Sequence, residues 1–286
     1  MIIASNIVLY TTSSNAGQLP LSIDHNGTGL LIINGNIEGM QGVYKTGTGT
    51  LVLNGQNRLA YGFNQEGGTT QVGVDGTFAS GPLGVGEVVL KGGTLEAING
   101  VRDLAGNTLA FDGTIKIKGD LSFSGTGNAK VVQDSTVTMT TVNDYLRTAN
   151  TLTGTGILTK NGLGTLELSG NSTAYNSGIH LEQGALSVGS ADGSGTNSAL
   201  GKGLLTFTGD AKLTNDASTA NKVTTITNNI SVNAGKSGNL AAEGGDLSFT
   251  GIISGAGNIV KTGTDKVIYL NTSTLTGKTI VREGIL

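Results

Sequence analysis

Hydrophobic residues alternate with polar ones in many short runs along the chain. Such pairs, two positions apart, are Leu51 and Leu53, Ile115 and Ile117, Leu121 and Phe123, Leu166 and Leu168, and Leu247 and Phe249. Alternation with period two is typical of a strand with one buried face. The best helical pattern, residues 142–149, is short and has β-branched neighbours, which weaken helices. The pattern therefore predicts an all-β protein built from short strands bounded by glycine, asparagine or aspartate.

Internal repeats organise these strands. One phrase recurs at residues 42–55, 156–170 and, more loosely, 257–270. Between the copies, residues 83–90 parallel residues 200–207, and residues 119–125 reappear almost unchanged as 245–251. The chain therefore divides into cassettes of several short units. The expected cassettes are approximately residues 30–145, 146–250 and 251–286, the last of them incomplete.

A repeat of short strands favours a parallel β-solenoid over a sandwich or a barrel. In a stack of turns, equivalent positions must recur so that like side chains lie above like, whereas a sandwich needs no internal copies. At roughly 20 to 25 residues per turn, residues 1–286 make about 12 to 14 turns of one continuous, elongated domain. Apolar side chains, including Phe123, Phe207 and Phe249, are expected to form ladders inside the stack. Glycines are expected at corners where successive turns crowd and no Cβ fits.

Composition changes this picture in two ways. The 48 glycines could indicate a flexible chain, but 37% of the residues are hydrophobic and they recur in order, so the chain can bury a core. The absence of cysteine excludes disulfides, thiolate zinc sites and a cysteine nucleophile. A net charge of −3 with few lysines and arginines argues against nucleic acid as a partner. No apolar stretch is long enough for a membrane-spanning helix, and no signal peptide is visible.

The second copy of the repeat is the most regular. It runs from Gly154 to Asn171 as Gly-Thr-Gly-Ile-Leu-Thr-Lys-Asn-Gly-Leu-Gly-Thr-Leu-Glu-Leu-Ser-Gly-Asn, with Tyr175 and Gly184-Ala185-Leu186 following. The first copy agrees over residues 39–55. Its continuation matches at Asn57, Tyr61 and Gly76-Thr77-Phe78, and the third copy departs at Asp265, Lys266 and Tyr269.

This phrase resembles the autotransporter-associated β-strand repeat, or passenger-associated transport repeat, of bacterial surface and autotransporter passenger proteins. The resemblance covers the repeat copies and is specific, because order and spacing agree in two full copies. It implies a right-handed parallel β-helix displayed outside a bacterial cell. Because the last residues, 280–286, stop within a strand pattern, we expect a fragment of a longer passenger, with an open edge through which copies self-associate.

Candidates for catalysis are few. Alternation places His180 on the outside between Ile179 and Leu181, His25 lies in a turn-like segment, and no nucleophile elbow exists. Candidate carboxylate pairs on neighbouring turns are Asp112 with Asp120 and Asp210 with Asp216. Glycoside hydrolysis needs two acids about 5 to 9 Å apart. These acids adjoin glycine, lysine or asparagine in apparent turns, where short acids cap the backbone, so capping is the favoured interpretation and no catalytic residue is predicted.

Binding motifs are also weak. The Gly-x-Gly pairs lack the third glycine of a dinucleotide site, and the two P-loop-like endings at residues 235–237 and 277–279 lack their upstream glycine. Residues 192–197 form an oxygen-rich turn that could hold a hard cation, with a solvated loop as the favoured alternative. The repeated lysines, Lys45, Lys160 and Lys261, are expected at corners, where their stems cover an apolar edge. We therefore predict no cofactor and no metal.

The sequence thus predicts a non-enzymatic, structural or adhesive segment of a secreted or cell-surface bacterial protein. Its expected partners are a host-cell or surface glycan or protein, or other copies of itself. Two alternatives stay open: a carbohydrate-active β-helix, either a polysaccharide lyase or a glycoside hydrolase, and the passenger of a pore-forming toxin.

Overall fold

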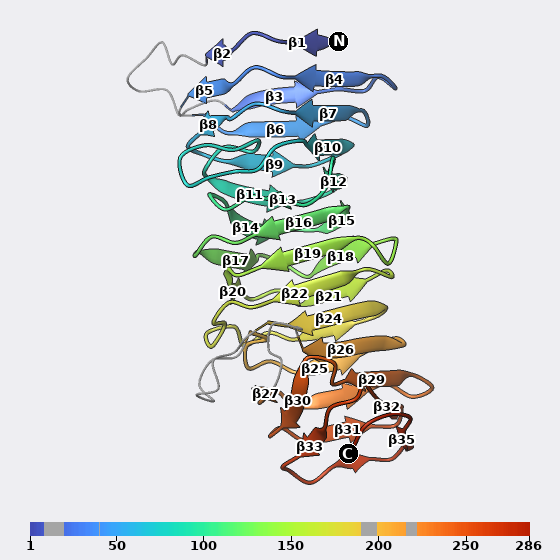
Figure 1. Ribbon diagram of the computed structural model, residues 1–286. Helices are drawn as coiled ribbons and strands as arrows, with labels where there is room; N and C mark the ends of the chain where they lie inside the picture. The colour runs from blue at the N-terminus through green and yellow to red at the C-terminus, as the bar shows by residue number, and fades with distance from the viewer. Residues whose placement is uncertain (9–19, 40, 190–198, 216–221) are drawn as a thin grey trace. The chain divides into compact units, whose positions relative to one another are not determined.

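The computed structural model describes residues 1–8, 20–39, 41–189, 199–215 and 222–286 (Figure 1). Within these residues the chain is all β, and every pairing between named strands is parallel. Residues 142–149, the best helical pattern, contain instead the strand β19 (Tyr145–Thr148). The predicted all-β parallel β-solenoid is confirmed. The chain separates into two compact units, residues 1–129 with 143–150, and residues 130–142 with 151–286.

The first unit stacks its strands in several parallel sheets. The longest sheet contains, in order, β1 (Ile2–Ile3), β4 (Leu30–Ile33), β7 (Thr50–Leu53), β10 (Thr69–Val72), β12 (Thr94–Ala97) and β15 (Thr114–Lys118). A second contains β3 (Leu21–Asp24), β6 (Val43–Thr46), β9 (Phe63–Gln65), β11 (Glu87–Leu90) and β14 (Thr108–Phe111). A three-stranded sheet contains β2 (Ile7–Val8), β5 (Ile37–Gly39) and β8 (Arg58–Leu59). The strands β13 (Arg102–Asp103), β16 (Asp120–Phe123) and β19 also pair, in that order.

The second unit has the same organisation. Its longest sheet contains β18 (Ser135–Met139), β21 (Leu158–Asn161), β23 (Ile179–Leu181), β25 (Leu205–Phe207), β28 (Ile230–Val232), β31 (Ile253–Gly255) and β34 (Thr274–Leu275). Another contains β22 (Thr165–Leu168), β24 (Gly184–Val188), β26 (Ala211–Asn215), β29 (Ser237–Ala241), β32 (Asn258–Thr262) and β35 (Thr279–Val281). A third contains β27 (Lys222–Ile226), β30 (Gly245–Phe249) and β33 (Val267–Tyr269). The second unit also contains β20 (Thr151–Gly154). The strand β17 (Asn128–Val131) begins in the first unit and ends in the second.

The register sets the length of a turn. Leu51 pairs with Thr70, 19 residues later, and Leu181 pairs with Phe207, 26 residues later. The structure has about 11 turns, slightly fewer than the predicted 12 to 14. One cause is the first step, in which Ile2 pairs with Ile32, 30 residues later.

Inward side chains form apolar ladders along each unit. In the second unit, Leu166, Leu186, Leu213 and Leu240 lie above one another on successive strands, and all are fully buried. The three phenylalanines expected in the core, Phe123, Phe207 and Phe249, are at most 1% exposed. Each such buried side chain contributes about 1.5 to 3 kcal/mol of hydrophobic stabilisation.

Glycines occupy the corners for the predicted reason. A Cβ on Gly156 would lie 2.1 Å from the carbonyl oxygen of Gln133, and one on Gly251 would lie 2.0 Å from that of Asn228. Both oxygens belong to the preceding turn, so the backbones of successive turns pack too closely there for any side chain. The high glycine content therefore serves close stacking.

Candidate functional site: buried lysines and the outer surface

The three repeated lysines lie inside the stack and not at its corners. Lys45, Lys160 and Lys261 are all fully buried, so the expectation that they lie at corners, where their stems cover an apolar edge, is wrong. Strand alternation explains the difference, because Lys160 lies two residues after the buried Leu158 on β21 and points to the same side. Lys160 and Lys261 interrupt apolar ladders: Lys160 pairs with Leu181, and Lys261 pairs with Leu240.

Backbone carbonyl groups hold each buried ammonium group. Lys160 Nζ donates to the carbonyl oxygens of Asn161 at 2.9 Å, Gly162 at 2.7 Å and Gln183 at 3.0 Å. The first two follow the lysine directly, and the third belongs to the next turn. An ammonium group has three donors and no acceptor, so this arrangement satisfies all of them. We call it the lysine cage.

The other two copies repeat the cage. Lys261 Nζ donates to Thr262, Gly263 and Glu283 at 2.7, 2.6 and 3.1 Å. Lys45 Nζ donates to Thr46, Gly47 and Gly67 in the same pattern. Among the described residues, none of the three lysines forms a salt bridge.

The lysine cage also requires a glycine from the next turn. Gly184 has a φ of +73°, and a Cβ there would lie 2.8 Å from Lys160 Nζ; Gly284 has the same relation to Lys261 at 2.7 Å. In the first copy the equivalent is Gly68, 2.9 Å from Lys45 Nζ, and not Gly76. The match of Gly76-Thr77-Phe78 to Gly184-Ala185-Leu186 is therefore wrong, and Phe78 is 76% exposed whereas Leu186 is fully buried.

The two tyrosines that the sequence repeat aligns, Tyr61 and Tyr175, also occupy different places in the structure. Tyr175 is fully buried, and its hydroxyl donates to the carbonyl oxygens of Gly156 at 2.8 Å and Gly178 at 3.1 Å. Tyr61, its counterpart in the sequence match, is 60% exposed. Leu59 takes the place of Tyr175, since Gly84 packs on Leu59 as Gly201 packs on Tyr175.

Asparagine side chains reinforce the corners that follow. Asn228 Nδ2 donates to the carbonyl oxygens of Gly201 at 3.1 Å and Gly203 at 2.8 Å, and Asn107 Nδ2 donates to Gly84 and Gly86 at 3.2 and 2.8 Å. These glycines belong to the paired segments 83–90 and 200–207. The internal repeat therefore preserves polar contacts in the core as well as apolar ladders.

Burial lowers the pKa of Lys160 from 10.5 to about 8, and it also lowers the pKa values of Lys45 and Lys261. Between pH 8 and 10.5 the unfolded chain thus holds more protons at Lys160 than the folded chain. The free energy of unfolding gains a contribution from Lys160 that rises with pH across this window and is constant below it.

We expect urea unfolding midpoints of the wild-type chain to rise between pH 8 and about 9.5, below the pKa near 10 of unfolded tyrosines. In Lys160→Met this contribution disappears, so the variant's midpoint should follow a lower slope over the same interval. Parallel slopes for the two proteins would contradict the buried, titrating lysine.

The two histidines have ordinary positions. His180 is half-exposed between the buried Ile179 and Leu181 on β23, as alternation predicted. His25 Nε2 lies 2.7 Å from the carbonyl oxygen of Gly29 within its own loop. These contacts give neither histidine a nucleophile to activate.

Three aspartates bond to backbone amides or to arginine. Asp210 accepts a hydrogen bond from the Ser237 amide at 2.8 Å, and Asp134 accepts one from the Ile157 amide at the same distance, each capping the next turn. Asp120 forms an ion pair with Arg147 on the neighbouring strand. Asp216, the proposed partner of Asp210, lies outside the described residues, as does the oxygen-rich turn 192–197. Elsewhere, in the described part, no three acidic or histidine side chains are placed to hold a metal ion.

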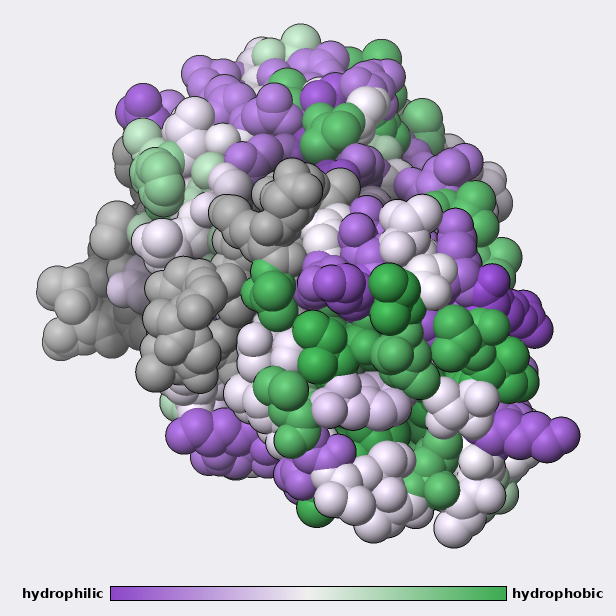
Figure 2. Space-filling model, turned by 60° about the horizontal axis from the view of Figure 1, so that its bottom comes forward, coloured by the Kyte–Doolittle hydropathy of each residue, from purple (hydrophilic) through white to green (hydrophobic). Residues whose placement is uncertain are grey.

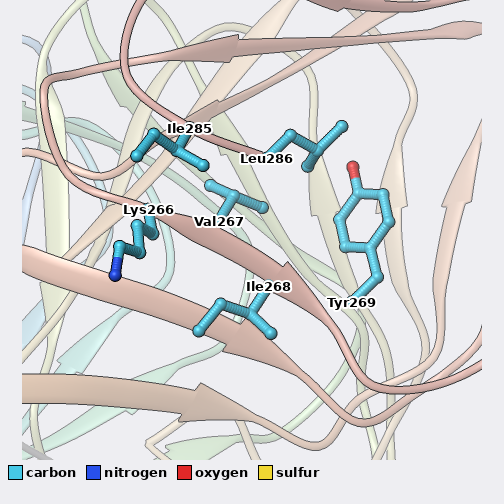
Figure 3. Close-up of a pocket in the computed structure, with 6 residues that line it drawn as sticks. All are labelled: Lys266, Val267, Ile268, Tyr269, Ile285 and Leu286. Atoms are coloured by element: carbon cyan, nitrogen blue, oxygen red, sulfur yellow. The ribbon is translucent and has the colours of Figure 1, made fainter.

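The strands β34 and β35 pair on one side only within the described chain, and on the outer side of β33 the Val267 amide donates to the Ile285 carbonyl at 2.9 Å. Hydrophobic side chains gather on this face (Figure 2), and those more than a third exposed are Leu270, Ile280, Val281, Ile285 and Leu286. A cavity of about 400 Å³ lies beside these side chains (Figure 3). It is lined by Lys266, Val267, Ile268, Tyr269, Ile285 and Leu286. Burial raises the pKa of Tyr269 to about 12, and its hydroxyl has no partner there.

The described residues include no helix capable of crossing a membrane. Over 199 residues, 66% of this chain, the sequence is 31% identical to "Adhesin BmaC autotransporter" of Brucella suis biovar 1 (strain 1330). The chain spans 5% of the length of that protein. No family model matches the sequence, and no solved structure matches it. The chain is thus similar to a small part of an autotransporter adhesin, and its solenoid fold fits a passenger-type repeat.

Proposed function

We propose that this chain is a non-enzymatic segment of a bacterial cell-surface passenger protein. The segment displays a binding part of that protein or mediates binding itself. The observation that carries the proposal is the 31% identity to an autotransporter adhesin across 199 residues. The parallel β-solenoid supports it, because a stack of turns presents a long, regular outer surface. The bonding of the polar groups supports it as well, since the lysines and the candidate acids Asp120 and Asp210 already have partners in the stack.

The proposal is tested by coating beads with the folded chain and counting those retained on cultured host cells and on immobilised extracellular matrix proteins. We expect retention above that of beads coated with the heat-unfolded chain. Equal counts on every surface would contradict a binding role.

Two further assays address the alternatives. Incubation with bacterial and host polysaccharides should release no reducing or unsaturated sugar ends, and liposomes should keep an entrapped dye. Sugar release that one Asp→Asn change abolishes would replace the proposal with a carbohydrate-active enzyme, and dye leakage would replace it with a pore-forming passenger.

Self-association belongs to the same proposal. The open edges of β34 and β35 and the apolar side chains beside them suit a second copy, since parallel strands can add to an open edge. Light scattering should show a mass that grows with concentration. A monodisperse monomer at high concentration would contradict this part.

A further inference from the structure

One outer face of the second unit carries an unbroken row of small polar side chains. The strands of its longest sheet pair in register, so that their outward residues lie above one another. The row consists of Thr136, Thr159, His180, Thr206, Ser231 and Ser254. With about 4.8 Å between strands, the row is about 24 Å long.

Most of these groups have no partner of their own. Among the described residues, hydrogen bonds involve no side chain of Thr136, Thr159, His180, Thr206 or Ser231, whereas Ser254 donates to the Ile230 carbonyl at 3.1 Å. Thr206, 8% exposed, lies recessed between its half-exposed neighbours His180 and Ser231. The row therefore offers hydroxyl and imidazole groups free to bond a ligand along its length.

A polar groove adjoins the row. Asn161 and Glu182 follow two residues after Thr159 and His180, and with Gln183, Thr208, Gly209, Asp210 and Lys236 they line a cavity of about 290 Å³. The side chains of Glu182, Gln183 and Lys236 are exposed and have no partner in the described part of the chain. The groove thus adds an amide, a carboxylate and an ammonium group to the hydroxyls of the row.

We propose that the row and the groove together bind a neutral oligosaccharide that lies along the stack. This inference rests on the proposed binding function and names its ligand class. A sugar chain presents hydroxyls at regular intervals, each both donor and acceptor, which suits threonine and serine hydroxyls, the Gln183 amide and the Glu182 carboxylate.

The charges and the backbone disfavour other ligands. Glu182 and Asp210 repel a polyanion such as an acidic polysaccharide or a nucleic acid, and Lys236 offsets only one of these two charges. A peptide strand cannot pair with this face, because the backbone groups of β21, β23, β25 and β28 already bond to strands on both sides.

The test is a printed panel of neutral oligosaccharides of glucose, mannose, galactose and N-acetylglucosamine, followed by calorimetric titration of the strongest binder. We expect affinity to rise with chain length until the sugar spans the row. The double variant Thr159→Val and Thr206→Val removes two hydroxyls at constant volume and should lower affinity at least tenfold. Glu182→Gln should weaken binding by a smaller factor.

The matched control is Thr69→Val with Thr94→Val, which alters two outward threonines of β10 and β12 in the first unit. Both double variants must unfold at the wild-type urea midpoint, and the control should bind like wild type. Equal affinity of the Thr159 and Thr206 variant and wild type would overturn the assignment of the site. Retention of beads on cells without binding of any neutral oligosaccharide would overturn this inference and leave the proposed function standing. Failure of both assays would overturn both.

Discussion

Replacing Lys160 by methionine is expected to lower the free energy of unfolding by about 2 to 4 kcal/mol. Methionine can fill the space of the lysine stem, but it leaves the buried carbonyl group of Gly162 without its donor, and the part-buried carbonyl groups of Asn161 and Gln183 lose theirs as well. Each buried carbonyl without a partner costs about 1 to 3 kcal/mol. Removal of the cost of burying a charge offsets part of this loss. Urea unfolding followed by circular dichroism at pH 7 measures the change.

The control for this experiment is Lys130→Met, because Lys130 is exposed on β17. It removes the same charge at the surface and should change the free energy of unfolding by less than about 0.5 kcal/mol. If Lys160→Met and Lys130→Met unfold at the same midpoint, the lysine cage contributes nothing to stability.

Replacing Gly184 by alanine is expected to destabilise the chain by about 3 kcal/mol or more, from two separate causes. The φ of +73° costs an alanine about 1 to 2 kcal/mol. In addition, the new Cβ would lie 2.2 Å from the carbonyl oxygen of Gly162, which itself accepts from Lys160. Backbone must move to relieve this overlap, and the movement disturbs the cage.

Gly235 provides the matched comparison. It has the same φ of +73°, but a Cβ there would meet nothing within 4 Å. Gly235→Ala therefore isolates the backbone cost, and thermal unfolding of the two variants separates that cost from the overlap. Equal losses of stability in the two variants would mean that the turn at Gly184 relaxes freely.

Most of the fold could be predicted from the sequence, because its causes are local and repeated. Period-two alternation predicts strands such as Leu166 to Leu168, and the internal copies predict that these strands stack. The close approach of turns at Gly156 follows from the same pattern. Such features depend on neighbours in the sequence and on equivalent positions one turn away.

Alternation, and not residue type, decides where the repeat lysines lie. Lys160 is expected at a corner because its stem can cover an apolar edge, although Leu158, two positions earlier, indicates the interior. Tyr61 and Gly76 agree with Tyr175 and Gly184 in residue type. In the structure, however, Leu59 and Gly68 occupy the positions that correspond to Tyr175 and Gly184.

The outer polar row could not be predicted either. Successive residues of the row lie 21 to 26 positions apart in the sequence. The shortest spacing is 21, from Thr159 to His180, and the longest is 26, from His180 to Thr206. The turn length changes from one step of the row to the next, so only the strand register shows that the side chains form one line. No motif in the sequence marks them.

Each of the three lysine cages joins the turn of its lysine to the turn that follows and to no other. Two of its three acceptors follow the lysine directly, and the third arrives 22 or 23 residues later. A turn that contains such a lysine is therefore incomplete until the following turn has folded onto it. Coupling of this kind between neighbouring turns favours folding that propagates along the chain from one turn to the next. No oxidant, metal or distant segment is needed to hold such a turn in place.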